Sequence, residues 1–241
     1  MINMDRMIAR IKNLSLLLPI FLCICIFNGF SFISDIRADE HFAKRYQAYQ
    51  QAVSSGKASL NKKDYQAAIE HYTRAIEMSP FVLSHYYDRG IAWYRKGEEK
   101  KAIDDFSKVI ILDPRSGSAY VYRGLCKVKG GDYQEALNDY KKGLELNPKD
   151  PSIHNNLAWL YATAKDEKFQ DKLKALEYAA KAAELSSERN AEVLDTLARV
   201  YFINGKINEA IETEKKALKL EPNNERFKEN LKEYEKAMKK D

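Results

Sequence analysis

Apolar residues recur along most of this chain at three- and four-residue steps, in segments separated by short polar turns. Such spacing places the apolar side chains on one face of a helix. The best-defined stretch predicts a first helix over residues 83–96, a turn at Gly97 and a second helix over 100–112. Small residues, Gly90 and Ala102, fall where these two helices are expected to approach closely. The pattern therefore predicts pairs of amphipathic helices.

The helix pairs repeat with a fixed period. Pro80, Pro114 and Pro148 are 34 residues apart, and Gly90 and Gly124 keep the same interval. A period of this size indicates a repeat protein, in which each unit buries its apolar face against its neighbours. Proline ends the second helix because it disfavours helical geometry in the preceding residue. The positions expected to support the repeat are Gly90, Gly124, Ala102, Ala136, Ala175, Ala210, Pro80, Pro114, Pro148 and Pro222.

The repeating positions resemble the tetratricopeptide repeat (TPR) family, whose pattern runs Trp-x2-Leu-Gly-x2-Tyr, then Ala-x3-Phe, then Pro. In the second unit the resemblance is carried by Tyr86, Gly90, Trp93, Ala102, Phe106 and Pro114. It implies an all-α fold, a right-handed α-solenoid of helix-turn-helix repeats. The array is expected over residues 39–223, with units near 49–82, 83–116, 117–150, 151–190 and 191–224, and a capping helix and tail at 224–241.

The fourth unit is longer than the others, with a period of 40 residues. Ala175 arrives five residues late, and the extra residues surround Phe169. Insertions in such arrays map to loops on one face, which is sometimes the binding face. The alternative interpretation is a lengthened turn that the fold merely tolerates.

Two arginine–aspartate combinations recur at the same offset. Arg89 precedes Asp105 as Arg123 precedes Asp139, and each arginine is followed by the glycine of the helix pair. The recurrence predicts a repeated ion pair that supports the fold.

The N-terminal 38 residues have the composition of a signal peptide or a signal anchor. Basic residues within 6–12 precede an apolar run over 14–27, and apolar character resumes up to residue 33. Residues 14–33 thus cover about the 20 residues that a membrane span needs, and membrane contact is expected through them. Cleavage after Ser31, cleavage after Ala38 and retention as an anchor all remain open.

Each of these alternatives predicts the same topology. The basic flank stays in the cytoplasm and the chain after Asp35 is exported. The protein is therefore expected to be periplasmic, or anchored to the cytoplasmic membrane and facing outward.

Composition narrows the functional classes. The chain has 40 Lys and Arg against 35 Asp and Glu, a net charge of +5, and the signs are well mixed, so no nucleic-acid partner is expected. Of the three cysteines only Cys126 lies outside the N-terminal segment, and the histidines lack metal-ligand spacing. The sequence has no phosphate loop and no nucleophile elbow. We therefore predict a non-enzymatic protein without cofactor, metal or small-molecule substrate.

The family resemblance implies that the first helix of each unit lines a concave face. These helices are apolar on nearly two faces, more than packing within one unit requires. The second apolar face either packs between neighbouring first helices or leaves an exposed groove of the kind that marks a partner site. Some family members clamp a carboxylate with Lys and Asn, but Tyr87, Asp88 and Ile91 replace that clamp here. The predicted groove comprises Tyr87, Ile91, Tyr94, Arg95, Val121, Leu125, Val128, Lys129, Asn155, Trp159, Asp195, Arg199 and Phe202.

Together these features predict a non-catalytic scaffold on the outer side of the cytoplasmic membrane. It would bind a peptide or helix of a protein partner during assembly of an envelope complex. Two alternatives remain: a periplasmic holding chaperone with a broad client range, and a non-catalytic subunit of an envelope enzyme.

Overall fold

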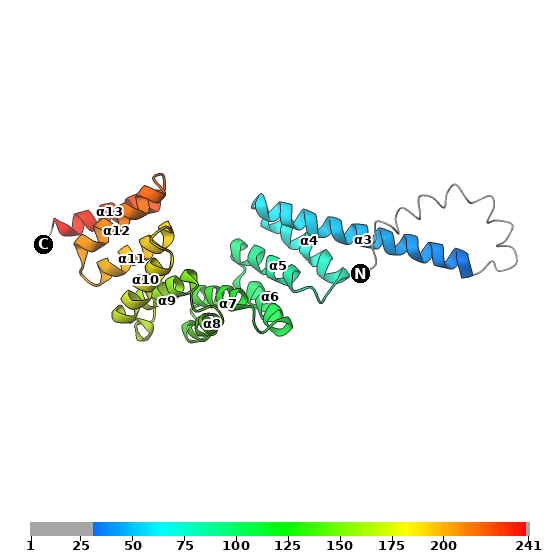
Figure 1. Ribbon diagram of the computed structural model, residues 1–241, viewed down its shortest axis with the longest axis horizontal. Coiled ribbons are helices and arrows are strands. Elements are labelled where there is room, and N and C mark those ends of the chain that lie inside the picture. The colour runs from blue at the N-terminus through cyan, green and yellow to red at the C-terminus, as the bar shows by residue number, and fades with distance from the viewer. Residues whose placement is uncertain (1–30, 240–241) are drawn as a thin grey trace. The chain divides into compact units, whose positions relative to one another are not determined.

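The computed structural model describes residues 31–239, with side chains for residues 40–239 (Figure 1). Within this range the secondary structure is helical, and no β-strand occurs. The chain divides into two compact units, residues 1–52 and 53–241. Helix α3 (Ser31–Asn61) crosses this division. The predicted all-α class is therefore confirmed for the described residues.

The described part of the first unit is the N-terminal portion of α3. This helix begins at Ser31, inside the segment expected to be a leader, and most of its side chains from Glu40 onward are exposed. The basic flank and most of the apolar run lie outside the described residues, so the signal or anchor assignment stays a prediction.

Of the helices that the structure describes, none combines the length and the apolar character required to cross a bilayer.

The second unit is a succession of helix pairs (Figure 1). Each helix packs on the next, and the first helices α5, α7, α9, α11 and α13 also contact one another in turn. This arrangement is an α-solenoid. After α3 its helices are α4 (Tyr65–Met78), α5 (Leu83–Lys96), α6 (Glu99–Leu112), α7 (Gly117–Gly130), α8 (Tyr133–Leu146), α9 (Pro151–Thr163), α10 (Lys172–Leu185), α11 (Ala191–Ile203), α12 (Ile207–Leu220) and α13 (Glu225–Met238).

Local sequence signals account for the ends of these helices. Gly97 and Gly131 end α5 and α7 with φ angles of 84° and 88°, a left-handed conformation that favours glycine. Asn224 accepts a hydrogen bond from the Phe227 backbone N–H at 3.4 Å and so caps α13. The inserted residues of the fourth unit form a short 3-10 helix, η1 (Glu167–Phe169), before α10 begins.

The contact between the two helices of each pair differs in detail from the expected one. A Cβ added to Gly90 would lie 2.9 Å from Cε1 of Phe106, and one on Gly124 would lie 2.6 Å from Cε1 of Tyr140. The atoms closest to the glycines are therefore aromatic rings, not the alanines Ala102 and Ala136. The ring lies over the glycine because it projects one turn further along the second helix.

The predicted alanine positions are interior. Ala102, Ala136 and Ala210 are fully buried and Ala175 is 1% exposed, whereas the helix-ending prolines Pro80, Pro114, Pro148 and Pro222 are exposed.

Gly124→Ala is expected to destabilise the array by about 1–3 kcal/mol, because the new methyl group overpacks the contact with Tyr140. Gly130, in the same helix, is the matched control, because a Cβ added there would have an Asp132 oxygen at 3.6 Å as its nearest neighbour. Gly130→Ala should be neutral or stabilise by about 0.5–1 kcal/mol. Urea unfolding followed by circular dichroism measures both changes. Equal unfolding midpoints for the two variants would contradict the close contact between Gly124 and Tyr140.

Arginine side chains fasten the helix pairs to one another. Arg123 forms two hydrogen bonds to Asp139, at 2.9 and 2.6 Å, and a third to Ser107 Oγ of the preceding unit at 3.1 Å. Arg89 makes the same three contacts with Asp105 and Thr73. Each arginine thus links the two helices of its own unit and the second helix of the unit before.

Candidate partner-binding site

A pocket of about 620 Å³ lies where the end of α7, the turn into α8 and the C-terminal half of α9 meet. Glu99 at the start of α6 completes its lining. The pocket joins residues of the third and fourth units, so it depends on how successive units stack. Other lining residues include Val128, Lys129, Tyr133, Trp159, Thr163 and Lys165.

Trp159 is the large apolar side chain of this pocket that faces solvent, with 41% of its surface exposed. The buried face of α9 carries Ile153, Leu157 and Leu160, which are at most 1% exposed. Trp159 falls between these positions and so points away from the core. An exposed tryptophan in a concave site is a typical anchor for a partner side chain.

Charged groups surround the aromatic surface. The Lys129 ammonium lies 4.3 Å from the centre of the Tyr94 ring and 3.5 Å from Glu99 Oε1. The Lys165 side chain is exposed, and its backbone N–H donates to the Tyr133 hydroxyl at 3.1 Å. The pocket therefore offers two cations and one carboxylate beside its apolar wall.

The insertion of the fourth unit braces this wall. Phe169 packs against Tyr133 with ring centres 5.5 Å apart. The Gln170 side chain donates to the Ala164 carbonyl at 2.8 Å, and the Asp171 backbone N–H donates to the Tyr161 carbonyl at 3.0 Å. The extra residues thus hold the end of α9 and Tyr133 in place.

The structure brings only part of the predicted groove together at this pocket, namely Val128, Lys129 and Trp159. Leu125 and Asn155 are half-buried and Arg95 is exposed, and these three residues do not line it. The predicted row is therefore not one continuous open groove.

Three predicted groove residues of the second unit, Tyr87, Ile91 and Tyr94, pack against α7 of the next unit. Tyr122 of α7 lies 5.7 Å from Tyr87, 6.1 Å from Tyr94 and 5.4 Å from Phe106, measured between ring centres. Ile91 joins the same cluster. Much of the second apolar face of these first helices is thus buried in contacts between neighbouring units. This agrees with the alternative that this face packs between units.

Two predicted groove residues are interior instead of open to a partner. Val121 is 7% exposed and packs against Gly143 of α8, and Asp195 is 3% exposed beneath α13. Arg199 and Phe202 are half-buried by contacts with Asn230, Glu233 and Tyr234 of α13. For Asp195, Arg199 and Phe202 the reason is that α13 packs directly over these positions.

Sequence reasoning missed Tyr133, Thr163 and Lys165 as pocket residues. Tyr133 belongs to a second helix, and the other two lie at the end of α9 next to the insertion. The unusual length of the fourth unit was the signal that pointed to this region.

Cys126 does not add a nucleophile. It is fully buried, and burial raises the pKa of its thiol to about 12, so the thiol stays protonated at neutral pH.

Three protein families match the sequence. Residues 53–119 match the family described as tetratricopeptide repeat, and residues 124–164 match the family described as TPR repeat. Residues 169–240 match the prolyl 4-hydroxylase peptide-substrate-binding domain. No curated protein sequence matches the chain.

Solved structures of TPR proteins share the fold. TTC0263, a thermophilic TPR protein of Thermus thermophilus, is 20% identical, with a TM-score of 0.65 over 77% of this chain and 98% of its own. MamA from residue 41 onward, of Desulfovibrio magneticus RS-1, is 19% identical, with a TM-score of 0.60 over 73% and 97%. YrrB, a TPR protein with an unusual peptide-binding site, is 20% identical, with a TM-score of 0.53 over 75% and 90%.

The helix pairs, the repeated glycine and alanine positions and the matching families agree. The chain belongs to the tetratricopeptide repeat family.

Proposed function

We propose that this chain is a non-catalytic scaffold that binds a peptide or helix of a protein partner at the pocket around Trp159. The observation that carries the proposal is an exposed tryptophan in a concave site between two repeats, beside Lys129 and Lys165. Aromatic side chains supply large contact area at low entropic cost, and lysines at the rim attract carboxylates of a partner.

The comparisons support a peptide or protein partner. One matching family is a peptide-substrate-binding domain, and one structural neighbour has a peptide-binding site. Because these relatives bind peptides on the same helical architecture, the corresponding use of this chain is the simplest inference.

Photo-crosslinking tests the proposal directly. A photoreactive phenylalanine analogue at Thr163 would report on the pocket, and the same analogue at Phe81 would serve as control, since Phe81 is 82% exposed and does not line it. We expect one or two proteins to be cross-linked from position 163 and not from 81. Many clients would favour the holding chaperone, and equal capture from both positions would remove the pocket from the proposal.

We further propose that the array functions outside the cytoplasm, in the periplasm or anchored to the cytoplasmic membrane, during assembly of an envelope complex. The support is the sequence of the first 38 residues, with a basic flank before an apolar run.

A reporter enzyme that is active only after export, fused behind Asp241, is expected to be active. Deleting residues 1–38 should abolish that activity, because the basic flank and apolar run direct export. Reporter activity in whole cells, with immunoblots to compare protein amounts, measures both. A fusion that is inactive, while a reporter that works only in the cytoplasm is active, would contradict the location.

A further inference from the structure

The junction between the last repeat and α13 differs in chemistry from an equivalent junction earlier in the array. Between the second and third units, Tyr87, Phe106 and Tyr122 form an aromatic cluster at intervals of 19 and 35 residues from Tyr87. The same intervals counted from the fifth unit give three polar residues, Asp195, Glu214 and Asn230. The repeat thus places two carboxyl groups where an apolar contact is used elsewhere.

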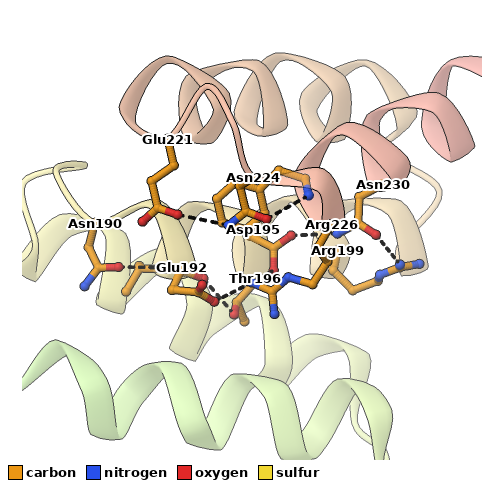
Figure 2. A network of polar contacts seen from close by, with 11 residues as sticks. Asn190, Glu192, Asp195, Thr196, Arg199, Glu221, Asn224, Arg226 and Asn230 are labelled. Carbon is orange, nitrogen blue, oxygen red and sulfur yellow. Dashed lines mark hydrogen bonds and ion pairs between the residues drawn. The ribbon is translucent and has the colours of Figure 1, made fainter. Parts of the chain in front are cut away.

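Both carboxyl groups are buried. Asp195 is 3% exposed and Glu214 is fully buried. Asp195 accepts a hydrogen bond from Asn230 Nδ2 at 2.7 Å, and its other oxygen lies 3.3 Å from the Arg226 guanidinium (Figure 2). Partners for the Asp195 charge therefore come from α13.

Glu214 has no such partner. Among the described residues no N–H or O–H group donates to either of its oxygens. Burial without a hydrogen-bond donor disfavours the charged form of a carboxyl group. The burial of Glu214 and the missing donors therefore indicate that its carboxyl group holds a proton when α13 is docked.

The surrounding charges do not replace that proton. On α13, Arg226 also pairs with Glu192 of α11, and Glu233 pairs with Arg199 of α11 at 3.1 Å. Tyr234 of α13 is fully buried, and its hydroxyl has no hydrogen-bond partner among the described residues. Residues 191–238 contain no histidine. Both arginines are thus shared with other carboxylates, and the carboxyl pair titrates without a histidine nearby.

We propose that docking of α13 onto α11 and α12 is coupled to this proton on Glu214, so that α13 loosens as the pH rises. Loosening would hydrate Glu214 and uncover Phe202 and Ala198, which pack beside Tyr234 in the closed state. The last concave surface of the array would then become accessible.

The direction of the pH effect follows from the linkage between proton binding and the docking of α13. Burial, and then the negative charge of Asp195, raises the pKa of Glu214 to about 8, whereas the hydrated group would return towards its ordinary value of 4.5. A carboxyl group whose pKa is raised in the docked state stabilises docking below the ordinary value and loses that contribution as the pH rises towards 8. Burial also raises the pKa of Asp195, in the same direction.

Hydrogen–deuterium exchange of the full-length chain tests the coupling, with rates corrected for the intrinsic effect of pH. Protection of α13 amides is expected to fall by about tenfold per pH unit between pH 5 and 7, since one proton is released on opening. Protection of α7 and α8 should stay constant. Glu214→Gln removes the titration and should make α13 protection independent of pH. Glu212→Gln, an exposed carboxylate on the same helix, should keep the wild-type profile.

Glu214→Met provides a second variant if the glutamine variant does not fold, because an apolar side chain suits this buried position. It should also give a flat profile. A wild-type α13 whose protection does not change with pH would overturn the proposal. So would a pH dependence that persists in both Glu214 variants, since another group would then be responsible.

Discussion

Arg89→Met is expected to destabilise the array by about 3–5 kcal/mol, because it leaves a buried carboxylate without a partner. Asp105 is 4% exposed and is held by two hydrogen bonds from Arg89, at 2.8 and 2.7 Å. Removing the arginine also frees Thr73 of the preceding unit, so two helix contacts are lost together. Urea unfolding at pH 7, followed by circular dichroism, measures the loss.

The equivalent change in the next unit should cost less. Asp139 accepts from Arg123 and also forms an ion pair with Lys127 Nζ at 2.8 Å. The position that corresponds to Lys127 in the second unit is Trp93. Arg123→Met therefore leaves Asp139 paired. Equal losses in the two variants would contradict the assigned contacts.

Two controls identify the cause of the Arg89 effect. Arg89→Met combined with Asp105→Leu removes both charges and should recover much of the stability. Burial already raises the pKa of Asp105, and losing Arg89 raises it further. The loss of unfolding free energy in Arg89→Met should consequently be larger at pH 7 than at pH 4, where the Asp105 carboxyl group is protonated.

Trp159→Ala is expected to weaken partner binding by thirtyfold or more, about 2 kcal/mol, because the side chain is the exposed aromatic anchor of the pocket. Its exposed fraction of 41% predicts little effect on the fold. Isothermal titration with the partner segment identified by cross-linking at position 163 measures the affinity. Phe81→Ala, at another exposed aromatic residue, is the matched control and should bind as the wild type.

The structure favours this single change over a combined replacement of Tyr87, Leu125 and Trp159. Tyr87 contacts Phe106 and Tyr122, and Leu125 is half-buried against the core, so changing them would combine loss of packing with loss of binding. Unchanged affinity of a folded Trp159→Ala variant would place the partner elsewhere on the array.

The helix pairs could be predicted from the sequence because their signals are local. The three- and four-residue apolar steps define each helix, Gly97 ends a first helix, and the proline that follows the second helix marks the next unit. The expected helix over 83–96 matches α5, and the expected helix over 100–112 matches α6 within one residue. The Arg–Asp pairs were also predictable, because an exact repeat places equivalent side chains in equivalent surroundings.

The site could be predicted only in part. The sequence indicated that the first helices carry more apolar surface than one unit needs, but not which part of it stays open. At the second unit Tyr122 fills that surface, and at the fifth α13 covers it with Asn230 and Glu233. The identity of the covering side chain depends on the neighbouring unit, not on the helix itself.

The sequence by itself therefore determined the helices, their pairing and the period of this TPR array, since these depend on backbone geometry and on positions close along the chain. Only the tertiary structure decided where a partner could enter. Trp159 remains exposed because the stacking of the third and fourth units, with Phe169 bracing Tyr133, leaves a pocket in front of it. Asp195 is inaccessible to a partner because α13 lies over it. Access to a side chain is set by the packing of distant segments, which no local pattern records.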